Sequence, residues 1–208
     1  MRNYEEREYD IRHAAAFKKT TEKWGGFSNM CGGFPLVVGE VRFQSAEALY
    51  QSCRFPNLPE VQEKIILQTS PMTAKMVSKP FREQTRADWI NVRVKIMKWC
   101  LRVKLAQNWD DFSQLLLDSG EMPIVELSNK DAFWGAKPLE SNTYLGINAL
   151  GRLLMGLREQ LINNDKEYFM VVPPLNIDNF LFLGHKIEAV KSIDKKPIAN
   201  NQAGLFDV

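Results

Sequence analysis

The chain has 208 residues, of which 45% are hydrophobic and 25% are charged, and its formal net charge is +2. This composition supports one sizeable core and excludes a strongly basic, histone-like protein, so any nucleic-acid contact must come from local basic patches. Cys31, Cys53 and Cys100 form no CxxC motif and only two histidines are present, which disfavours a disulfide framework, a metal site and a Ser-His-Asp triad.

The predicted elements mix helices with short strands. In chain order we expect a hairpin over 35–43 with its turn at Gly39-Glu40, helices over about 46–54, 59–68 and from 71, a long helix over 89–107, a helix from Asp110 to near Gly120, a strand over 123–127 and a last helix after Asn148. Ser45, Ser70, Asp88 and Asn148 are the expected N-caps. The segments FMVVPP and FLFLGHKIEAV then indicate extended chain.

These elements predict an α+β fold, a mostly helical single domain with short strands at both ends. We divide the chain into a lead-in over 1–15, a catalytic domain over 16–163, a β-containing extension over 164–193 and a flexible tail over 194–208. No apolar run reaches the ~20 residues of a membrane-spanning helix, and the polar start is not typical of a signal peptide. We therefore expect a cytoplasmic protein with no membrane partner.

The long helix places two cations on its apolar face. Lys95, Lys98 and Arg102 fall together on a helical wheel, whereas Arg93 and Lys104 fall nearly opposite them, among apolar side chains. A buried cation needs compensation, so these two either form structural salt bridges or line a cavity for an anionic ligand. A desolvated lysine in such a cavity can also lose its proton and act as a nucleophile.

Glu47 and the stretch SNKDAFWGAK, residues 128–137, are the other candidate site elements. Glu47 is expected in the first turn of a helix, where an acid interacts favourably with the helix macrodipole. This position alone therefore explains the residue without a catalytic role. The stretch, however, holds Asp131 beside the aromatic Phe133 and Trp134, with Gly135 next, which is unusual for either a core strand or a solvent loop. An acid beside an aromatic wall suggests a ligand site.

Several short motifs, taken in order, make the chain resemble the NADAR family over about residues 16–161. They are Phe27-Ser28-Asn29, Ser45-x-Glu47-x-x-Tyr50-Gln51, Ala74-Lys75, the separate Trp89, Met97, Lys104 and Glu126, Asp131-x-x-Trp134-Gly135, and Asn148-x-Leu150-Gly151-x-Leu153-Leu154-Met155-x-x-Arg158. One departure is Ala48, where the family often has a histidine after the glutamate, so no histidine helper is available there.

The resemblance implies hydrolysis of N-glycosidic bonds without a metal or a cofactor. Two activities are associated with the family: glycosidase action on early riboflavin intermediates, and removal of ADP-ribose from guanine. The stretches CRFPNLPEVQ, SPMTAKM and IMKWCLRVKLAQNW look most like the branch that acts as antitoxin to a DNA ADP-ribosyltransferase. The expected partners are therefore ADP-ribosylated DNA and, by genetic linkage, a cognate toxin.

Roles follow from the resemblance and from side-chain chemistry. We expect Glu47 to shuttle a proton and orient the ribose, Lys104 to act as a fixed cation or as a Schiff-base amine, and Asp131 to polarise a hydroxyl or the leaving amine. The expected ligand-binding residues are Ser28, Asn29, Gln51, Trp89, Arg93, Trp134, Gly135 and Asn148. Tryptophans stack on bases and an arginine suits a pyrophosphate.

Three functional hypotheses remain from the sequence. They are a hydrolase that frees ADP-ribose from guanine in DNA, a glycosidase of riboflavin intermediates, and a non-catalytic module that holds ADP-ribose or a toxin. In addition, Gln202-x-x-Leu205-Phe206 looks like the motif with which bacterial DNA-processing proteins dock on the replication sliding clamp. A fraying terminus is the alternative explanation for these residues.

Overall fold

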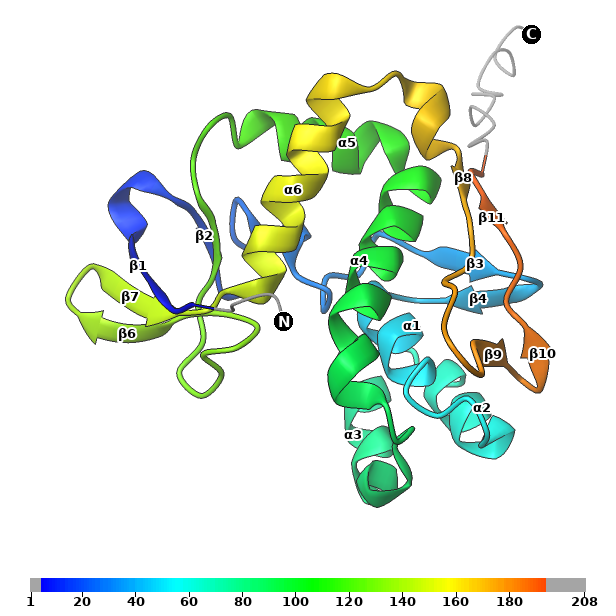
Figure 1. The fold of residues 1–208 in the computed structure, drawn as a ribbon. Helices are drawn as coiled ribbons and strands as arrows, with labels where there is room; N and C mark the ends of the chain where they lie inside the picture. Colours follow the sequence, from blue (N-terminus) through cyan, green and yellow to red (C-terminus); the bar gives the residue numbers. More distant parts are fainter. Residues whose placement is uncertain (1–4, 194–208) are drawn as a thin grey trace, which may run out of the picture.

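The computed structural model describes residues 5–193, with helices at the centre and short strands around them (Figure 1). The helices are α1 (Ala46–Ser52), α2 (Pro59–Ile66), α3 (Pro71–Ser78), α4 (Trp89–Gln107), α5 (Trp109–Asp118) and α6 (Ala149–Asn163). Short 3-10 helices are η1 (Ile11–His13), η2 (Gly25–Phe27), η3 (Lys79–Gln84) and η4 (Lys166–Phe169). The predicted α+β fold class is confirmed.

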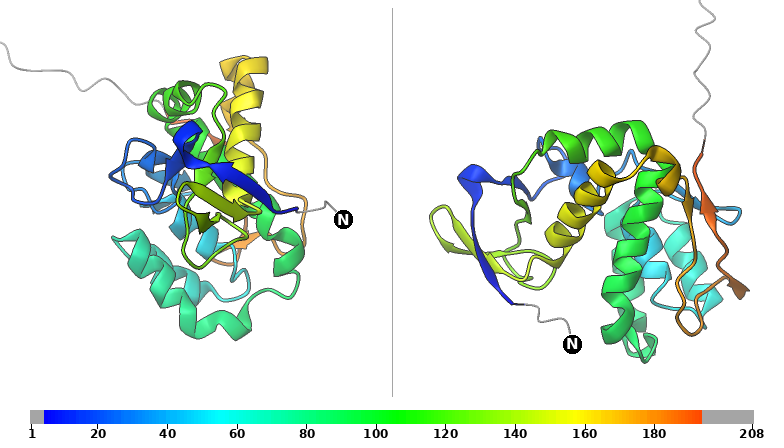
Figure 2. Two further views of the ribbon diagram at one scale, coloured as in Figure 1. Left: turned by 90° about the vertical axis from the view of Figure 1, so that its left-hand side faces the viewer. Right: turned by 45° about the horizontal axis from the view of Figure 1, so that its top comes forward.

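The strands pair in small sheets on two sides of the helices. They are β1 (Arg7–Asp10), β2 (Ala15–Phe17), β3 (Leu36–Val38), β4 (Val41–Phe43), β5 (Ile124–Glu126), β6 (Lys137–Glu140), β7 (Thr143–Gly146), β8 (Val171–Val172), β9 (Leu181–Phe182), β10 (His185–Lys186) and β11 (Val190–Lys191). Figure 2 shows β1, β6 and β7 together on one side of the molecule and β8 to β11 on the other. Within residues 5–193, no helix is both long and apolar enough to cross a membrane.

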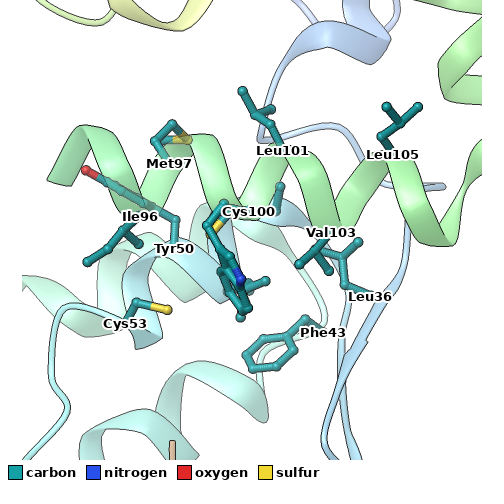
Figure 3. Close-up of a cluster of buried hydrophobic side chains, with 14 of the residues drawn as sticks. Leu36, Phe43, Tyr50, Cys53, Ile96, Met97, Cys100, Leu101, Val103 and Leu105 are labelled. Carbon is teal, nitrogen blue, oxygen red and sulfur yellow. The ribbon is translucent and has the colours of Figure 1, made fainter. Parts of the chain in front are cut away.

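Helix α4 runs through the middle of the hydrophobic core. Its sequence is apolar on most sides, which is typical of a helix that is surrounded by other elements. Figure 3 shows Ile96 near Tyr50 of α1, and Val103 near Leu36 of β3. The predicted span of this helix, 89–107, is confirmed.

The sequence did not predict β1, β2 or the β6–β7 hairpin. β1 pairs antiparallel with β7, which pairs with β6, and β2 pairs in parallel with β5. All four residues of β6 are exposed, so no apolar alternation marks this strand in the sequence. Partners more than a hundred residues away hold β1 and β2 in place, and local propensity cannot reveal such partners.

The segment after α6 completes the same core. The ring centroids of Phe182 and Phe43 are 5.1 Å apart, and those of Phe180 and Trp99 are 5.0 Å apart. The segments on either side of residue 163, where we placed a boundary, therefore share one hydrophobic core. The predicted tail over 194–208, with Gln202, Leu205 and Phe206, lies outside the described residues.

Two of the predicted helix caps have other roles. Ser45 caps α1 as expected, because its hydroxyl accepts from the Ala48 N–H at 3.2 Å. Asp88 makes no cap bond, since its carboxylate instead accepts from the Arg86 guanidinium at 2.6 Å. Asn148 is also not a side-chain cap: it has a left-handed φ of 51°, and its side chain is turned toward β5.

Strand β5 and helix α6 meet at very short range. The Asn148 amide donates to the Ile124 carbonyl at 2.9 Å and accepts from the Glu126 N–H at 3.2 Å. A Cβ on Gly151 would overlap the Ile124 carbonyl, and a Cβ on Gly135 would overlap the Glu126 carbonyl. Glycine is therefore required at both positions, because only glycine allows the backbones to approach this closely.

Two glycines of α6 provide a test of this close approach. We expect Gly151→Ala to destabilise the fold by roughly 2–4 kcal/mol, because its methyl group forces α6 away from β5. Gly156→Ala in the same helix meets no atom within 4 Å. This control should stabilise by about 0.5–1 kcal/mol through helix propensity. Urea unfolding of both variants checks the prediction, which fails if Gly151→Ala is as stable as Gly156→Ala.

Candidate active site

A cavity of about 470 Å³ opens between α1, α3, the start of α4 and the loop that follows β5. Its volume lies within the ~300–1,000 Å³ that is usual for small-molecule sites. The lining residues are Ser28, Asn29, Met30, Glu47, Tyr50, Gln51, Arg54, Lys75, Arg82, Trp89, Arg93, Met97, Glu126, Ser128, Asp131, Trp134 and Leu150. The structure thus brings together most of the predicted site residues from segments far apart in sequence.

Glu47 lies on the floor of the cavity, held from several sides. Its side chain is 8% exposed, and one carboxylate oxygen accepts from Gln51 at 2.9 Å and lies 3.8 Å from the Lys75 ammonium. Its backbone N–H donates to the Asn29 carbonyl at 3.1 Å. The cation and the amide both contact the Glu47 carboxylate, while the Lys75 side chain remains 48% exposed.

Glu126 is a second acid at the cavity, and the sequence reasoning gave it no role. Desolvation, with smaller contributions from the charges of Glu47 and Asp131, raises the pKa of Glu126 to about 7. At neutral pH this carboxyl group therefore carries a proton for much of the time. Its appearance among the family-like motifs was the available signal, but its environment comes only from the folded structure.

Aromatic rings form one wall of the cavity. The Tyr50 ring lies 5.1 Å from Trp89 and 5.7 Å from Trp134 between centroids, so the three rings support one another. The Arg93 guanidinium lies 3.7 Å from the centroid of the Phe133 ring. Both predicted tryptophans are thus at the cavity, with an arginine beside them.

Two polar atoms at the cavity are buried without a hydrogen-bond partner among residues 5–193. They are Oδ1 of Asn29 and Nε of Arg93. Buried polar atoms are normally paired, so an acceptor and a donor at this position suit a polar ligand. The Asn29 amide nitrogen, by contrast, contacts the Met97 sulfur at 2.9 Å, which fixes the side chain.

Asp131 lies at the rim of the cavity and shapes the loop that carries Trp134. One of its carboxylate oxygens accepts from the backbone N–H groups of Phe133 at 2.8 Å and Trp134 at 2.9 Å. This bonding pattern is that of an Asx-type turn. The position agrees with a site residue, and the hydrogen bonds show that positioning Trp134 is one part of its role.

Lys104 is buried as predicted but lies away from the cavity. Its ammonium donates to the Gly26 carbonyl at 2.6 Å and the Ser28 carbonyl at 3.3 Å, and it lies 4.4 Å from the ring centroids of Phe34 and Phe112. Burial lowers the pKa of Lys104 to about 7. The Schiff-base role expected for it is corrected here, because its amine faces carbonyls and rings rather than the cavity. Lys104 instead fastens the loop that carries Ser28.

Gly135 and Asn148 also have structural positions rather than the expected ligand contacts. Neither lines the cavity. Gly135 lies against the Glu126 carbonyl, and Asn148 binds the backbone of β5 on both sides of Val125. Both therefore help to hold Glu126 in its place at the cavity.

Four cations lie at the cavity together with three acids. They are Arg54, Lys75, Arg82 and Arg93, and only Arg93 was expected from the sequence. One guanidinium group can donate two parallel hydrogen bonds to two oxygens of a phosphate, so the cavity suits a phosphorylated ligand. Within residues 5–193, no three His, Cys, Asp or Glu side chains gather in a way that could hold a metal ion.

Comparison with known proteins shows what this chain is similar to. Residues 16–162 match the NADAR domain. The chain is 32% identical to the N-glycosidase YbiA of Escherichia coli over 70% of this chain and 86% of that protein. It is 31% identical to a riboflavin biosynthesis protein of Vibrio vulnificus over 74% of this chain, but spans only 41% of that protein. The NMR structure of E. coli YbiA superposes with a TM-score of 0.61 and 30% identity, covering 71% of this chain and 84% of that one.

The environment of Glu126 predicts a pH-dependent contribution to stability. Its pKa of about 7 in the fold exceeds the usual value of 4.5 for a glutamate, so the group stabilises the fold below about pH 4.5 and loses this contribution as the pH rises through 7. The loss should be on the order of 1–3 kcal/mol. We expect Glu126→Gln, which cannot ionise at this position, to lack this loss of stability with rising pH. Urea unfolding from pH 4.5 to 8 gives the difference between the two proteins, and parallel pH profiles would refute the shifted pKa.

Proposed function

The chain belongs to the NADAR family, and on that premise we propose that it is a hydrolase that cleaves the N-glycosidic bond of a phosphorylated ribosyl compound. The observation that carries the proposal is that two acids, Glu47 and Glu126, lie in one cavity with four cations and two tryptophans. Relatives that match this chain over most of their own length are named N-glycosidases, and these names support the same class of reaction.

The two acids suit opposite steps of the reaction. Cleavage of a bond between an anomeric carbon and nitrogen builds positive charge on the sugar and negative charge on the leaving nitrogen. Glu126, protonated near neutral pH, is the group that can donate a proton to that nitrogen. Glu47, in contact with Lys75 and Gln51, is the carboxylate that can stabilise the sugar cation and accept a proton from the attacking water.

For the substrate we propose ADP-ribose attached to guanine in DNA. The cavity has four cations, which is more than one phosphate monoester requires. This number suits the two adjacent phosphates of ADP-ribose. Trp89 and Trp134 supply aromatic faces for a base. Removal of the modification would reverse the action of a DNA ADP-ribosyltransferase toxin, and the protein would then be an antitoxin that acts enzymatically.

A second candidate substrate is a ribosylated intermediate of riboflavin biosynthesis. The names of two relatives, from Vibrio vulnificus and Zea mays, favour this reading. Such a compound is small enough to enter the cavity completely, so it would need no surface outside the opening. The two candidates share the bond cleaved and the roles of Glu47 and Glu126, and they differ in what lies beyond the sugar.

If the sugar opens during the reaction, Lys75 is placed to react with it. Its ammonium lines the cavity 3.8 Å from Glu47, which can take its proton. The free amine would attack the anomeric carbon of the opened sugar, the guanine amine would leave with a proton, and water would then release the sugar from the lysine. This assigns to Lys75 the role that the sequence reasoning gave to Lys104.

The substrate proposal predicts release of ADP-ribose from a single-stranded oligonucleotide that carries one ADP-ribosyl-guanine. We expect Glu47→Gln to lower turnover by at least about 100-fold, because it removes the carboxylate and keeps the shape. Glu60→Gln is the matched control, since Glu60 is an exposed acid in the first turn of α2. Chromatography of the products measures both rates. No release by the wild type, together with cleavage of ribosylaminopyrimidines, would favour the riboflavin substrate instead.

The lysine assignment predicts where borohydride would trap the sugar. Reduction during turnover should leave the sugar on Lys75, and peptide mapping by mass spectrometry locates it. Lys104 should carry none, because its amine lies between two carbonyls and two rings away from the cavity. An adduct on Lys104 would contradict the placement, and no adduct on any lysine would restrict Lys75 to an electrostatic role.

A further inference from the structure

One face of α3 carries two exposed methionines between two lysines. Four residues with the spacing i, i+3, i+4 and i+7 lie on one side of this helix: Met72, Lys75, Met76 and Lys79. The last of them is the residue that directly follows the helix. Met72 is 56% exposed and Met76 is 54% exposed. We call this set the α3 stripe. Two large thioether side chains left in water one turn apart indicate a contact surface.

The α3 stripe borders the opening of the cavity. Lys75, in its middle, lines the cavity and pairs with Glu47 on the floor. Arg82, in η3 directly after the stripe, lines the cavity as well. A ligand that projects out of the cavity past Lys75 and Arg82 therefore passes over the two methionines.

The proposed substrate must project in this way. The cavity of about 470 Å³ is within the range that one small ligand fills, and a modified DNA strand continues on both sides of the guanine. With the ribose bond beside Glu47, the nucleotides that flank the guanine remain outside. They need a surface with apolar faces for bases and cations for phosphates.

We propose that the α3 stripe is a docking surface for the single-stranded DNA that flanks the modified guanine. The inference rests on the proposed function and specifies the part of the substrate that lies outside the cavity. The thioethers of Met72 and Met76 pack on base faces, and Lys79 and Arg82 bind the phosphates between them.

Charge supports a nucleic acid as the occupant. The exposed charged side chains of α3 and η3 are Lys75, Lys79, Arg82 and the acid Glu83. Three cations thus face one acid along this edge, whereas the net charge of the whole chain is only +2. Methionines and cations in alternation match a strand that presents bases and phosphates in alternation.

Binding of an unmodified single strand tests the surface without any need for turnover. The probe is a fluorescent mixed-sequence DNA 12-mer, and anisotropy gives its dissociation constant at several salt concentrations. We expect the double variant Met72→Gln/Met76→Gln to bind at least about fivefold more weakly. Lys79→Gln should bind more weakly and reduce the slope of log K against log salt by about 0.7.

Lys191→Gln is the matched control for Lys79→Gln. Lys191 is an exposed lysine on β11, away from α3 in Figure 1, so its loss removes the same charge from another face. We expect its affinity and salt slope to equal those of the wild type. Equal affinity of the double methionine variant and the wild type, or no binding by the wild type, overturns the docking surface.

Turnover separates this inference from the proposed function. With the modified oligonucleotide, the methionine variant should raise KM at least about fivefold, whereas with ADP-ribosyl-guanosine alone KM should not change. Release of ADP-ribose with the same KM in both proteins keeps the function and removes the docking surface. Strand binding that depends on the methionines, without release of ADP-ribose, keeps the surface and removes the function.

Discussion

The site depends on the close contact between the end of β5 and the start of α6. Gly135 lies directly against the Glu126 carbonyl, and Gly151 lies directly against the Ile124 carbonyl. Asn148 also binds this strand, through its side-chain amide. These contacts fix the strand that carries Glu126 at the edge of the cavity. The carboxyl group is poorly solvated there and near the charge of Glu47, and its raised pKa follows from that position.

A second fastening acts on the opposite side of the cavity. The buried Lys104 ammonium donates to the Gly26 and Ser28 carbonyls and has two aromatic faces as neighbours, so the segment at η2 is tied to α4. Glu47 in turn depends on that loop through its bond to the Asn29 carbonyl. Burial of a lysine opposes its charge, and this fastening therefore costs some stability while it holds the segment that carries Ser28 in place.

The sequence predicted the helices well and the site in part, for physical reasons. The span of α4 and the inward direction of Arg93 and Lys104 follow from helical periodicity, and the family-like motifs led to Glu47, Trp89 and Trp134. Of these site residues, Glu47, Trp89, Arg93 and Trp134 lie at the cavity. Periodicity reports that a side chain points inward but not what it meets there.

The missed features all arise from tertiary contacts. The carbonyls around Lys104, the poor solvation of Glu126 and the place of Lys75 at the cavity come from segments distant in sequence. For the same reason the strands β1 and β2 were missing from the prediction, because their partners lie beyond residue 120. The order in which these segments leave the ribosome has a consequence for folding. The cavity cannot form completely until α6 has been synthesised, because Leu150 of α6 lines it. A nascent chain that ends at Gln107 therefore exposes apolar sides of α1 and α4 that later segments cover in the finished fold.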